Sequence, residues 1–182
     1  MKKNYINKYL NKFTSLLIEE DELSKKIIQA SKILKKTYKK NKIFIFGNGG
    51  SASIASHFTV DIIKNTNLKC VNFSDTALLT CFSNDFGYAN WISKALKIYA
   101  KSSDVVILIS SSGNSKNMIN AANYTKKNNL NLITLTGFEK SNRLNKRGKV
   151  NFWIDSKNYN HIENIHQILL LTICDYIANK NF

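Results

Sequence analysis

The sequence contains no proline and only three cysteines among its 182 residues. Cys70, Cys81 and Cys174 are widely spaced, so they form neither a CxxC pair nor a disulfide framework. We therefore expect a reducing, cytoplasmic environment. No apolar run approaches the roughly 20 residues that a membrane helix needs, and the first residues lack the apolar core of a signal peptide. These absences argue against disulfide-stapled, secreted and membrane-spanning classes.

Acidic residues are also few: 12 Asp and Glu stand against 27 Lys and Arg, which gives a net charge of +15. Such an excess can indicate a nucleic-acid partner. The lysines are scattered along the chain and Asn is abundant, which favours a compositional bias on solvated surfaces over a DNA-binding face. A positive field would also steer an anionic substrate toward the protein. The 43% of hydrophobic and 21% of charged residues predict a folded chain.

The hydrophobic pattern predicts a single domain over residues 1–182, with N-terminal helices in 1–40 and an α/β core in 41–182. Apolar side chains recur at helical spacing over residues 4–20, and Asp21 is a candidate cap for a second helix. Two helices ahead of any strand resemble an added helical hairpin, which is a common oligomerisation element.

Short apolar segments, rich in β-branched and aromatic residues, alternate with helical patterns after residue 41. The expected strands are 42–46, 70–73, 104–109, 131–135 and 150–154. The expected helices are 52–64, 75–82 with Ser74 as N-cap, 88–100, a helix ending near 127, and 161–178. This alternation predicts a parallel sheet covered on both faces. Ligands of such sheets bind beyond the carboxyl ends of the strands, where the strand order reverses.

Two polar loops each join an expected strand to the helix that follows. In the first, Gly47–Ser51, glycines let backbone N–H groups approach a ligand, and the helix N-terminus adds a positive dipole. The second, Ser110–Ser115, places several hydroxyls around another helix N-terminus. Ser, Gly and Asn are also ordinary turn and capping residues. Two such loops on one sheet nevertheless favour a phosphate monoester held by neutral hydrogen bonds.

The first loop also matches a dinucleotide-binding pattern, G-x-G-x-x-A, over residues 47–52. That pattern requires an acidic residue about 20 positions later, at the end of the next strand. The nearest candidate, Asp75, comes late and belongs to an expected helix start. The pattern also leaves the serine loop unexplained, so we place dinucleotide binding well behind phosphate binding.

Five motifs carry a resemblance to a known family: FGNGGSA at 46–52, HF at 57–58, SNDFGY at 83–88, ISSSGNS at 109–115 and ITLTG at 133–137. Together they resemble the sugar isomerase (SIS) domain, and specifically its phosphoheptose isomerase branch. The resemblance implies a flavodoxin-like three-layer sandwich with a five-stranded parallel sheet, usually assembled as a homotetramer. It also implies conversion of sedoheptulose 7-phosphate to D-glycero-D-manno-heptose 7-phosphate, toward heptose for lipopolysaccharide or capsule.

The resemblance assigns substrate-binding roles to residues of both loops. By motif match, the phosphate would be held by Ser110, Ser111, Ser112 and Ser115. The sugar chain would be contacted by Asn48, Gly49, Gly50, Ser51 and Asp85.

The catalytic residues depart from the family pattern. Isomerisation moves a proton between adjacent carbons, and it needs a base together with an acid or metal that polarises the carbonyl. The resemblance implies a His and a Glu four residues apart on one helix, and a Gln and a His eight residues apart on the last, as zinc ligands and acid/base groups. Here His57 is kept, but Asp61 replaces the Glu, Glu163 replaces the Gln and Leu171 replaces the second His.

We predict that His57, Asp61 and Glu163 form the reacting cluster. His57 and Asp61 share a helix face because they are four residues apart. One of two neighbouring carboxylates would keep a proton and act as the acid, or all three residues would ligate a divalent metal such as Zn²⁺. The loss of the His at Leu171 leaves two alternatives open. One is a non-catalytic scaffold of the replication-initiator-associating type, and the other is a sugar-phosphate-binding regulator.

Overall fold

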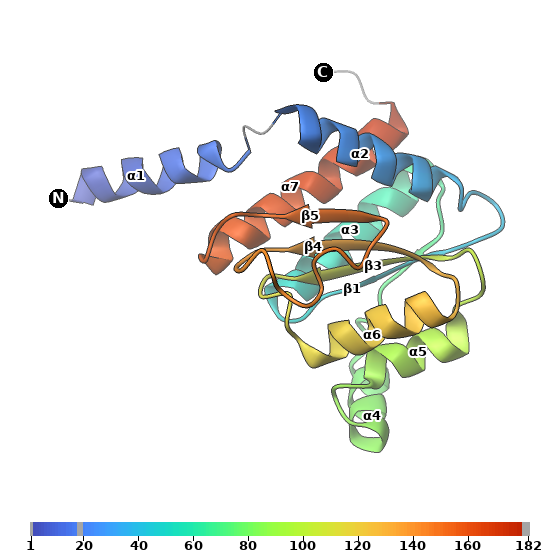
Figure 1. Cartoon of the computed structure of the whole chain (residues 1–182). Helices are drawn as coiled ribbons and strands as arrows, with labels where there is room; N and C mark the ends of the chain where they lie inside the picture. Colours follow the sequence, from blue (N-terminus) through green and yellow to red (C-terminus); the bar gives the residue numbers. More distant parts are fainter. Residues whose placement is uncertain (1, 18–19, 180–182) are drawn as a thin grey trace.

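The computed structural model describes residues 2–17 and 20–179. Helices and strands alternate through most of the chain, as the sequence pattern predicts (Figure 1). The helices are α1 (Lys2–Ser15), α2 (Glu20–Lys35), α3 (Gly50–Thr66), α4 (Thr76–Phe86), α5 (Trp91–Tyr99), α6 (Lys116–Lys127) and α7 (Tyr159–Ala178). The strands are β1 (Ile43–Phe46), β2 (Cys70–Val71), β3 (Val105–Ser110), β4 (Asn131–Thr136) and β5 (Val150–Trp153).

The strands form one five-stranded sheet with the order β2-β1-β3-β4-β5, and every neighbouring pair is parallel. The predicted α/β class with a five-stranded parallel sheet is therefore confirmed. The order reverses between β1 and β3, because β2 lies on one side of β1 and the later strands lie on the other. The loops after β1 and β3 consequently leave the sheet side by side.

Helices cover both faces of this sheet, which explains why β1 and the first five residues of β3 are all apolar (Figure 1). Alternate side chains of β1 enter two separate cores. Ile43 and Ile45 pack with α2, α3 and α7, whereas Phe44 and Phe46 pack with α5 and α6. Burying side chains of this size stabilises the fold by about 1.5–3 kcal/mol each. None of the helices in the described segments combines the length and apolar character needed to span a membrane.

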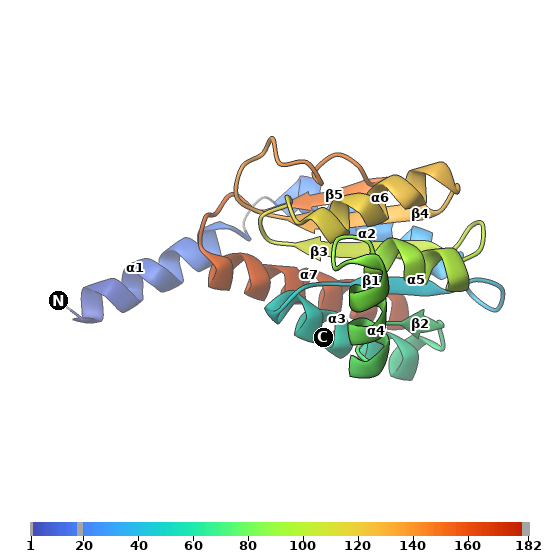
Figure 2. The same cartoon turned by 90° about the horizontal axis from the view of Figure 1, so that it is seen from below.

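The two N-terminal helices do not form the hairpin expected from the sequence. α2 packs along α7, but α1 projects away from the body of the molecule (Figures 1 and 2). The helix meets the body from Tyr9 onward: Tyr9 packs against His161, and Phe13 and the following Leu16 and Leu17 pack against the core. Tyr5, Ile6 and Leu10 remain exposed. The apolar spacing predicted the helix correctly, but spacing alone carries no information on its direction.

Two expected helix caps also differ. The N-cap of α4 is Asp75, whose carboxylate accepts a 2.8 Å hydrogen bond from the backbone N–H of Leu78. Ser74 lies one residue earlier. A carboxylate at this position also complements the positive end of the helix, which favours Asp over the neighbouring Ser. Asp21 lies within α2 rather than before it, because that helix already includes Glu20.

Candidate active site

The glycine and serine loops line one shared cavity of about 200 Å³ at the point where the strand order reverses. The lining side chains come from the end of β3, the two loops and the first turns of α3 and α7: Asn48, Ser51, Ile109, Ser110, Ser111, Ser112, Ser115, Tyr159 and Glu163. All four predicted phosphate-binding serines are among them. The amino ends of α3 and α6 add positive dipoles to loops already rich in hydroxyl groups.

The serine loop keeps hydroxyl groups available to a ligand. Ser111 is buried, yet its hydroxyl has no hydrogen-bond partner within the described part of the chain. Ser115 occupies the N-cap position of α6, but its side chain makes no capping bond; it accepts only a 3.4 Å contact from Ser110. An unpartnered buried hydroxyl is costly unless something fills the site. This arrangement suits an anion that accepts several hydrogen bonds.

Gly113 allows the sharp turn of the serine loop. Its φ of 64° lies in the left-handed region, and a Cβ there would collide with the Asn142 side chain. The loop is also held by its carbonyl oxygen, which accepts a 2.9 Å hydrogen bond from the backbone N–H of Leu144. The segment before β5 therefore supports the shape of the cavity.

Glu163 lies against the start of α3. A Cβ on Gly50, the first residue of that helix, would overlap the Glu163 carboxylate. Gly50 thus lets the carboxylate approach the helix closely, and the carboxylate sits where the positive end of the α3 dipole favours it. Glu163 is the one acidic side chain among the described residues that line the cavity. It is therefore placed for proton transfer to or from a ligand.

Asn48 is oriented by two neighbours that come from other parts of the chain. The hydroxyl of Tyr88 donates to Asn48 Oδ1 at 2.9 Å, and the Asn117 amide donates to the same oxygen at 2.8 Å. Asn48 Nδ2 in turn donates to Asn117 Oδ1 at 3.2 Å. With its oxygen already accepting two bonds, Asn48 presents its remaining amide hydrogen as a donor to the cavity.

Replacing Tyr88 with Phe should therefore weaken ligand binding without unfolding the protein. The loss of one side-chain hydrogen bond costs about 1 kcal/mol, which corresponds to a roughly fivefold higher Kd. Titration calorimetry with a sugar phosphate measures this effect. Tyr99→Phe is the matched control, because no hydrogen bond of the Tyr99 hydroxyl is found in the described chain. Equal affinities for the two variants would contradict the positioning role.

A second polar cluster lies farther along the contact between α3 and α7. His57 Nε2 is 3.4 Å from Asp61 Oδ2, and the Gln167 amide donates to His57 Nδ1 at 3.3 Å. Accepting at Nδ1 leaves Nε2 to carry the proton that faces Asp61. The two helices run side by side in the same direction, since Gly50 meets Glu163, His57 meets Gln167 and Asn65 meets Cys174. Leu171 is thus level with Asp61, where it supplies no polar group.

The three-residue group predicted from the sequence is not assembled within one chain. Glu163 is at the cavity beside Gly50, whereas His57 follows Gly50 by seven residues, or about 10 Å along a helix. Among the described side chains, no three His, Cys, Asp or Glu residues come together in a group that could hold a metal ion. Helical periodicity correctly predicted that His57 and Asp61 share one face of α3. Glu163 of α7 lies at a different height along the two helices, beside Gly50.

Asp85 is also away from the cavity. It lies at the end of α4, the helix that extends below the body in Figure 1. Its carboxylate accepts from Cys81 Sγ at 3.6 Å and from the Asn84 amide at 3.0 Å. The sequence pattern could not predict this separation, since it depends on the direction that α4 takes after β2.

The other two histidines are structural. His161 is buried and packs against Tyr9, with ring centroids 4.2 Å apart and ring planes tilted by 50°. His166 is fully buried, and its Nε2–H donates to the Thr136 carbonyl at 3.2 Å. Burial disfavours the charged imidazolium and lowers the pKa of His166 to about 4.

Mild acid should therefore destabilise the protein through His166. In the unfolded chain this pKa is near 6.5, so the unfolded state takes up the proton first as the pH falls from 6.5 toward 4. Stability should be complete above pH 6.5 and about 2 kcal/mol lower at pH 5 than at pH 7 from this residue alone. Denaturant unfolding at both pH values measures it. The difference in unfolding free energy between pH 7 and pH 5 should be about 2 kcal/mol smaller in His166→Gln. An unchanged difference would contradict the assignment of this effect to His166.

The sequence of this chain is similar to those of known proteins. Residues 8–137 match the SIS domain, which is most of the chain. The chain belongs to the SIS domain family. This SIS protein is 31% identical to the phosphoheptose isomerase of Sulfurimonas denitrificans over 190 residues, covering 99% of this chain and 97% of the relative. It is also 31% identical to that of Aliarcobacter butzleri, with 99% and 98% covered.

Solved structures agree with these sequence relatives. The phosphoheptose isomerase of Neisseria gonorrhoeae superimposes with a TM-score of 0.86 and 27% identity over 99% of this chain and 100% of that one. That of Francisella tularensis gives a TM-score of 0.87 and 26% identity, with the same coverage. This SIS protein is therefore related over its full length to phosphoheptose isomerases.

Two residues of this SIS site were not predicted from the sequence. Tyr159 lines the cavity from the first turn of α7, and Asn117 orients Asn48 from α6. Asn117 carried a usable sequence signal, since it is a polar residue in the first helical turn after the serine loop. The structure shows that it is almost completely buried. Tyr159 lies two residues before His161 and gave no signal that distinguishes it from a surface aromatic.

Proposed function

We propose that this SIS protein is an aldose–ketose isomerase that converts sedoheptulose 7-phosphate to D-glycero-D-manno-heptose 7-phosphate, for heptose in lipopolysaccharide or capsule. The observation that carries the proposal is the shared cavity, in which the serine loop and Glu163 face the same space. The similarity to phosphoheptose isomerases across 99% of the chain supports the choice of substrate.

The phosphate end of the substrate would bind at the serine loop. Ser111 and Ser115 offer hydroxyls that lack strong partners, and the α6 amino end favours negative charge. The cavity of about 200 Å³ is smaller than a typical ligand site of about 300–1,000 Å³. It would therefore hold the phosphate end while the rest of the sugar extends past Asn48, with Gly49, Gly50 and Ser51 on the same side.

Proton transfer would use Glu163 as the group that faces the bound sugar. A base takes the proton from C1 of the ketose and the carbonyl oxygen at C2 gains a proton, which gives an enediol. C2 then takes up a proton while the C1 hydroxyl loses its own, which yields the aldose. His57 and Asp61 form a second polar pair at the contact between α3 and α7, and Gln167 orients the imidazole of His57. We propose that this pair assists proton transfer at the far end of the substrate.

Zn²⁺ does not fit the residues of one chain. The family pattern that implies this ion supplies two imidazoles, and here the position of the second holds Leu171. The remaining candidates, His57, Asp61 and Glu163, do not form a three-ligand group among the described residues. In the proposed reaction, side chains alone transfer the protons.

We further propose that the protein acts in the cytoplasm as a homotetramer. The exposed apolar residues on the projecting α1, namely Tyr5, Ile6 and Leu10, favour burial against other copies of the chain. Asp85 on the extended α4 would likewise reach a cavity only in another subunit.

Incubation of the purified protein with sedoheptulose 7-phosphate tests the proposal. Proton NMR in D₂O should show the aldose product with deuterium incorporated at C2, since the transferred proton exchanges with solvent. Binding of the sugar phosphate without turnover would reject the isomerase.

That outcome would favour the second candidate function, a non-catalytic SIS scaffold or sugar-phosphate-binding regulator. The observation that supports it is Leu171, which stands level with Asp61 and cannot take part in proton transfer.

A further inference from the structure

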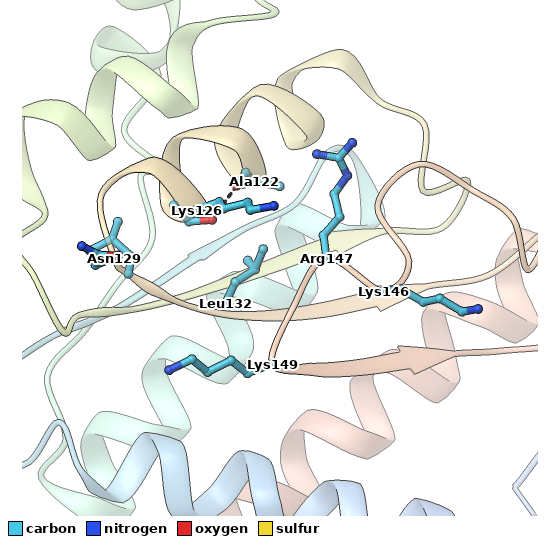
Figure 3. A pocket seen from close by; sticks show the side chains of 9 residues that line it. Ala122, Lys126, Asn129, Leu132, Lys146, Arg147 and Lys149 are labelled. Atoms are coloured by element: carbon cyan, nitrogen blue, oxygen red, sulfur yellow. Dashed lines mark hydrogen bonds between the residues drawn. The ribbon is translucent and has the colours of Figure 1, made fainter.

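A second cavity, of about 620 Å³, opens at the amino ends of β4 and β5, at the opposite edge of the sheet from the serine loop. It lies between α6 and residues 146–149, the segment that leads into β5 (Figure 3). None of the residues in the isomerase site lines it. The cavity is therefore separate from the proposed isomerase site.

Among the described residues, four cationic side chains and no acidic side chain line this cavity: Lys126, Lys146, Arg147 and Lys149. None of the four makes an ion pair within the described part of the chain. Lys126, Arg147 and Lys149 lie around Leu132, whereas Lys146 extends away from it (Figure 3). Positive charges gathered without counter-charges repel one another, and a bound anion would relieve that repulsion.

Two of the cations are held in place by uncharged acceptors. The Arg147 guanidinium donates to Asn123 Oδ1 at 2.5 Å and also to the Arg143 carbonyl. Lys149 Nζ donates to Asn131 Oδ1 at 2.6 Å. These bonds limit the rotamers of both side chains but leave their charges uncompensated. A guanidinium positioned in this way loses less conformational entropy when it binds a phosphate.

The floor of the cavity and its size favour a small molecule. Ala122, Leu130 and Leu132 form an apolar base beneath the cationic rim. The volume of about 620 Å³ falls in the range of sites for cofactors and other small ligands, about 300–1,000 Å³. A nucleic-acid strand would instead require a basic groove that continues along the surface.

We propose that this cavity binds a small anion that carries a diphosphate group, either as inorganic diphosphate or as part of a nucleoside diphosphate. Lys126, Arg147 and Lys149 would pair with the phosphate oxygens through charge-assisted hydrogen bonds. A base, where one is present, would cover the apolar floor. The proposal is independent of the isomerase activity.

Titration calorimetry of the full chain with sodium diphosphate, and separately with ADP, tests the proposal. We expect saturable binding that weakens as salt is added. Lys126→Gln/Arg147→Gln should bind at least about tenfold more weakly, because two charge-assisted contacts are lost. Lys36→Gln/Lys97→Gln removes the same charge from exposed positions elsewhere and should stay within about twofold of the original affinity.

Further variants separate this cavity from the serine loop and from effects on folding. Ser112→Ala/Ser115→Ala should keep diphosphate binding, since these residues line the other cavity. Lys126→Gln alone removes no hydrogen bond found in the described chain. It should still weaken binding about threefold or more if the double variant proves unstable.

The two ligands distinguish the sources of the diphosphate group. Tighter binding of ADP indicates a nucleotide, and equal binding indicates inorganic diphosphate. The proposal is overturned if neither ligand saturates, if the control pair weakens binding as much as Lys126→Gln/Arg147→Gln, or if a single-stranded oligonucleotide binds while both small anions do not.

Discussion

Replacing both Ser111 and Ser115 with alanine should weaken binding of sedoheptulose 7-phosphate by at least about 100-fold. Each hydroxyl is expected to donate to a charged phosphate oxygen, and a hydrogen bond to a charged group contributes about 1.5–3 kcal/mol. Two such losses come to about 3 kcal/mol or more, or at least two orders of magnitude in Kd. Calorimetric titration of the sugar phosphate measures the change.

The fold should tolerate this double replacement. Removing the Ser111 hydroxyl relieves a buried polar group that has no partner in the described structure, so the melting temperature should stay constant or rise slightly. Ser74→Ala/Ser102→Ala is the matched control, because both serines are exposed and outside the cavity. If affinity falls equally in both double variants, the serine loop is not the phosphate site.

Glu163→Gln should reduce kcat by at least about 100-fold while leaving substrate binding unchanged or tighter. An amide cannot transfer the proton, and the loss of a general acid or base typically costs about 10²–10⁴ in rate. The carboxylate shares its cavity with the proposed phosphate site, so removing its charge also removes repulsion of the substrate. Steady-state kinetics, together with a separate Kd measurement, distinguishes these two effects.

Glu139→Gln is the corresponding control, since Glu139 is an exposed carboxylate that pairs with Lys157 away from the cavity. Asp61→Asn provides a second comparison. A smaller loss of kcat in Asp61→Asn than in Glu163→Gln would agree with the distance of about two helical turns between the His57–Asp61 pair and the cavity. Full turnover in Glu163→Gln would remove this residue from the reaction.

Much of the α/β architecture could be predicted because its physical signals are local. Buried parallel strands are largely apolar and rich in β-branched residues, so residues 104–109 and 131–135 identified β3 and β4 to within one residue. Glycine and serine loops after such strands must lie at the carboxyl edge of the sheet. Adjacency of β1 and β3 then brought the two loops to one cavity.

The remaining features depend on contacts between distant segments. Nothing local indicates that the apolar stripe of α1 leaves the body, or that α4 carries Asp85 away from the cavity. The offset of His57 from Glu163 follows from how α3 packs beside α7. Residue spacing within one helix determines which side chains share a face. Which residues of two neighbouring helices lie at the same height depends on how the helices pack.

The contact between Gly50 and Glu163 also constrains how this protein and its relatives diverge. A side chain larger than hydrogen at position 50 would overlap the Glu163 carboxylate unless that flexible side chain moved aside. We therefore expect the residues at these two positions to depend on each other. A lineage that acquires alanine or serine at the first must shorten or redirect the second, and such paired exchanges would leave a covariation signal between residues 113 positions apart in the sequence.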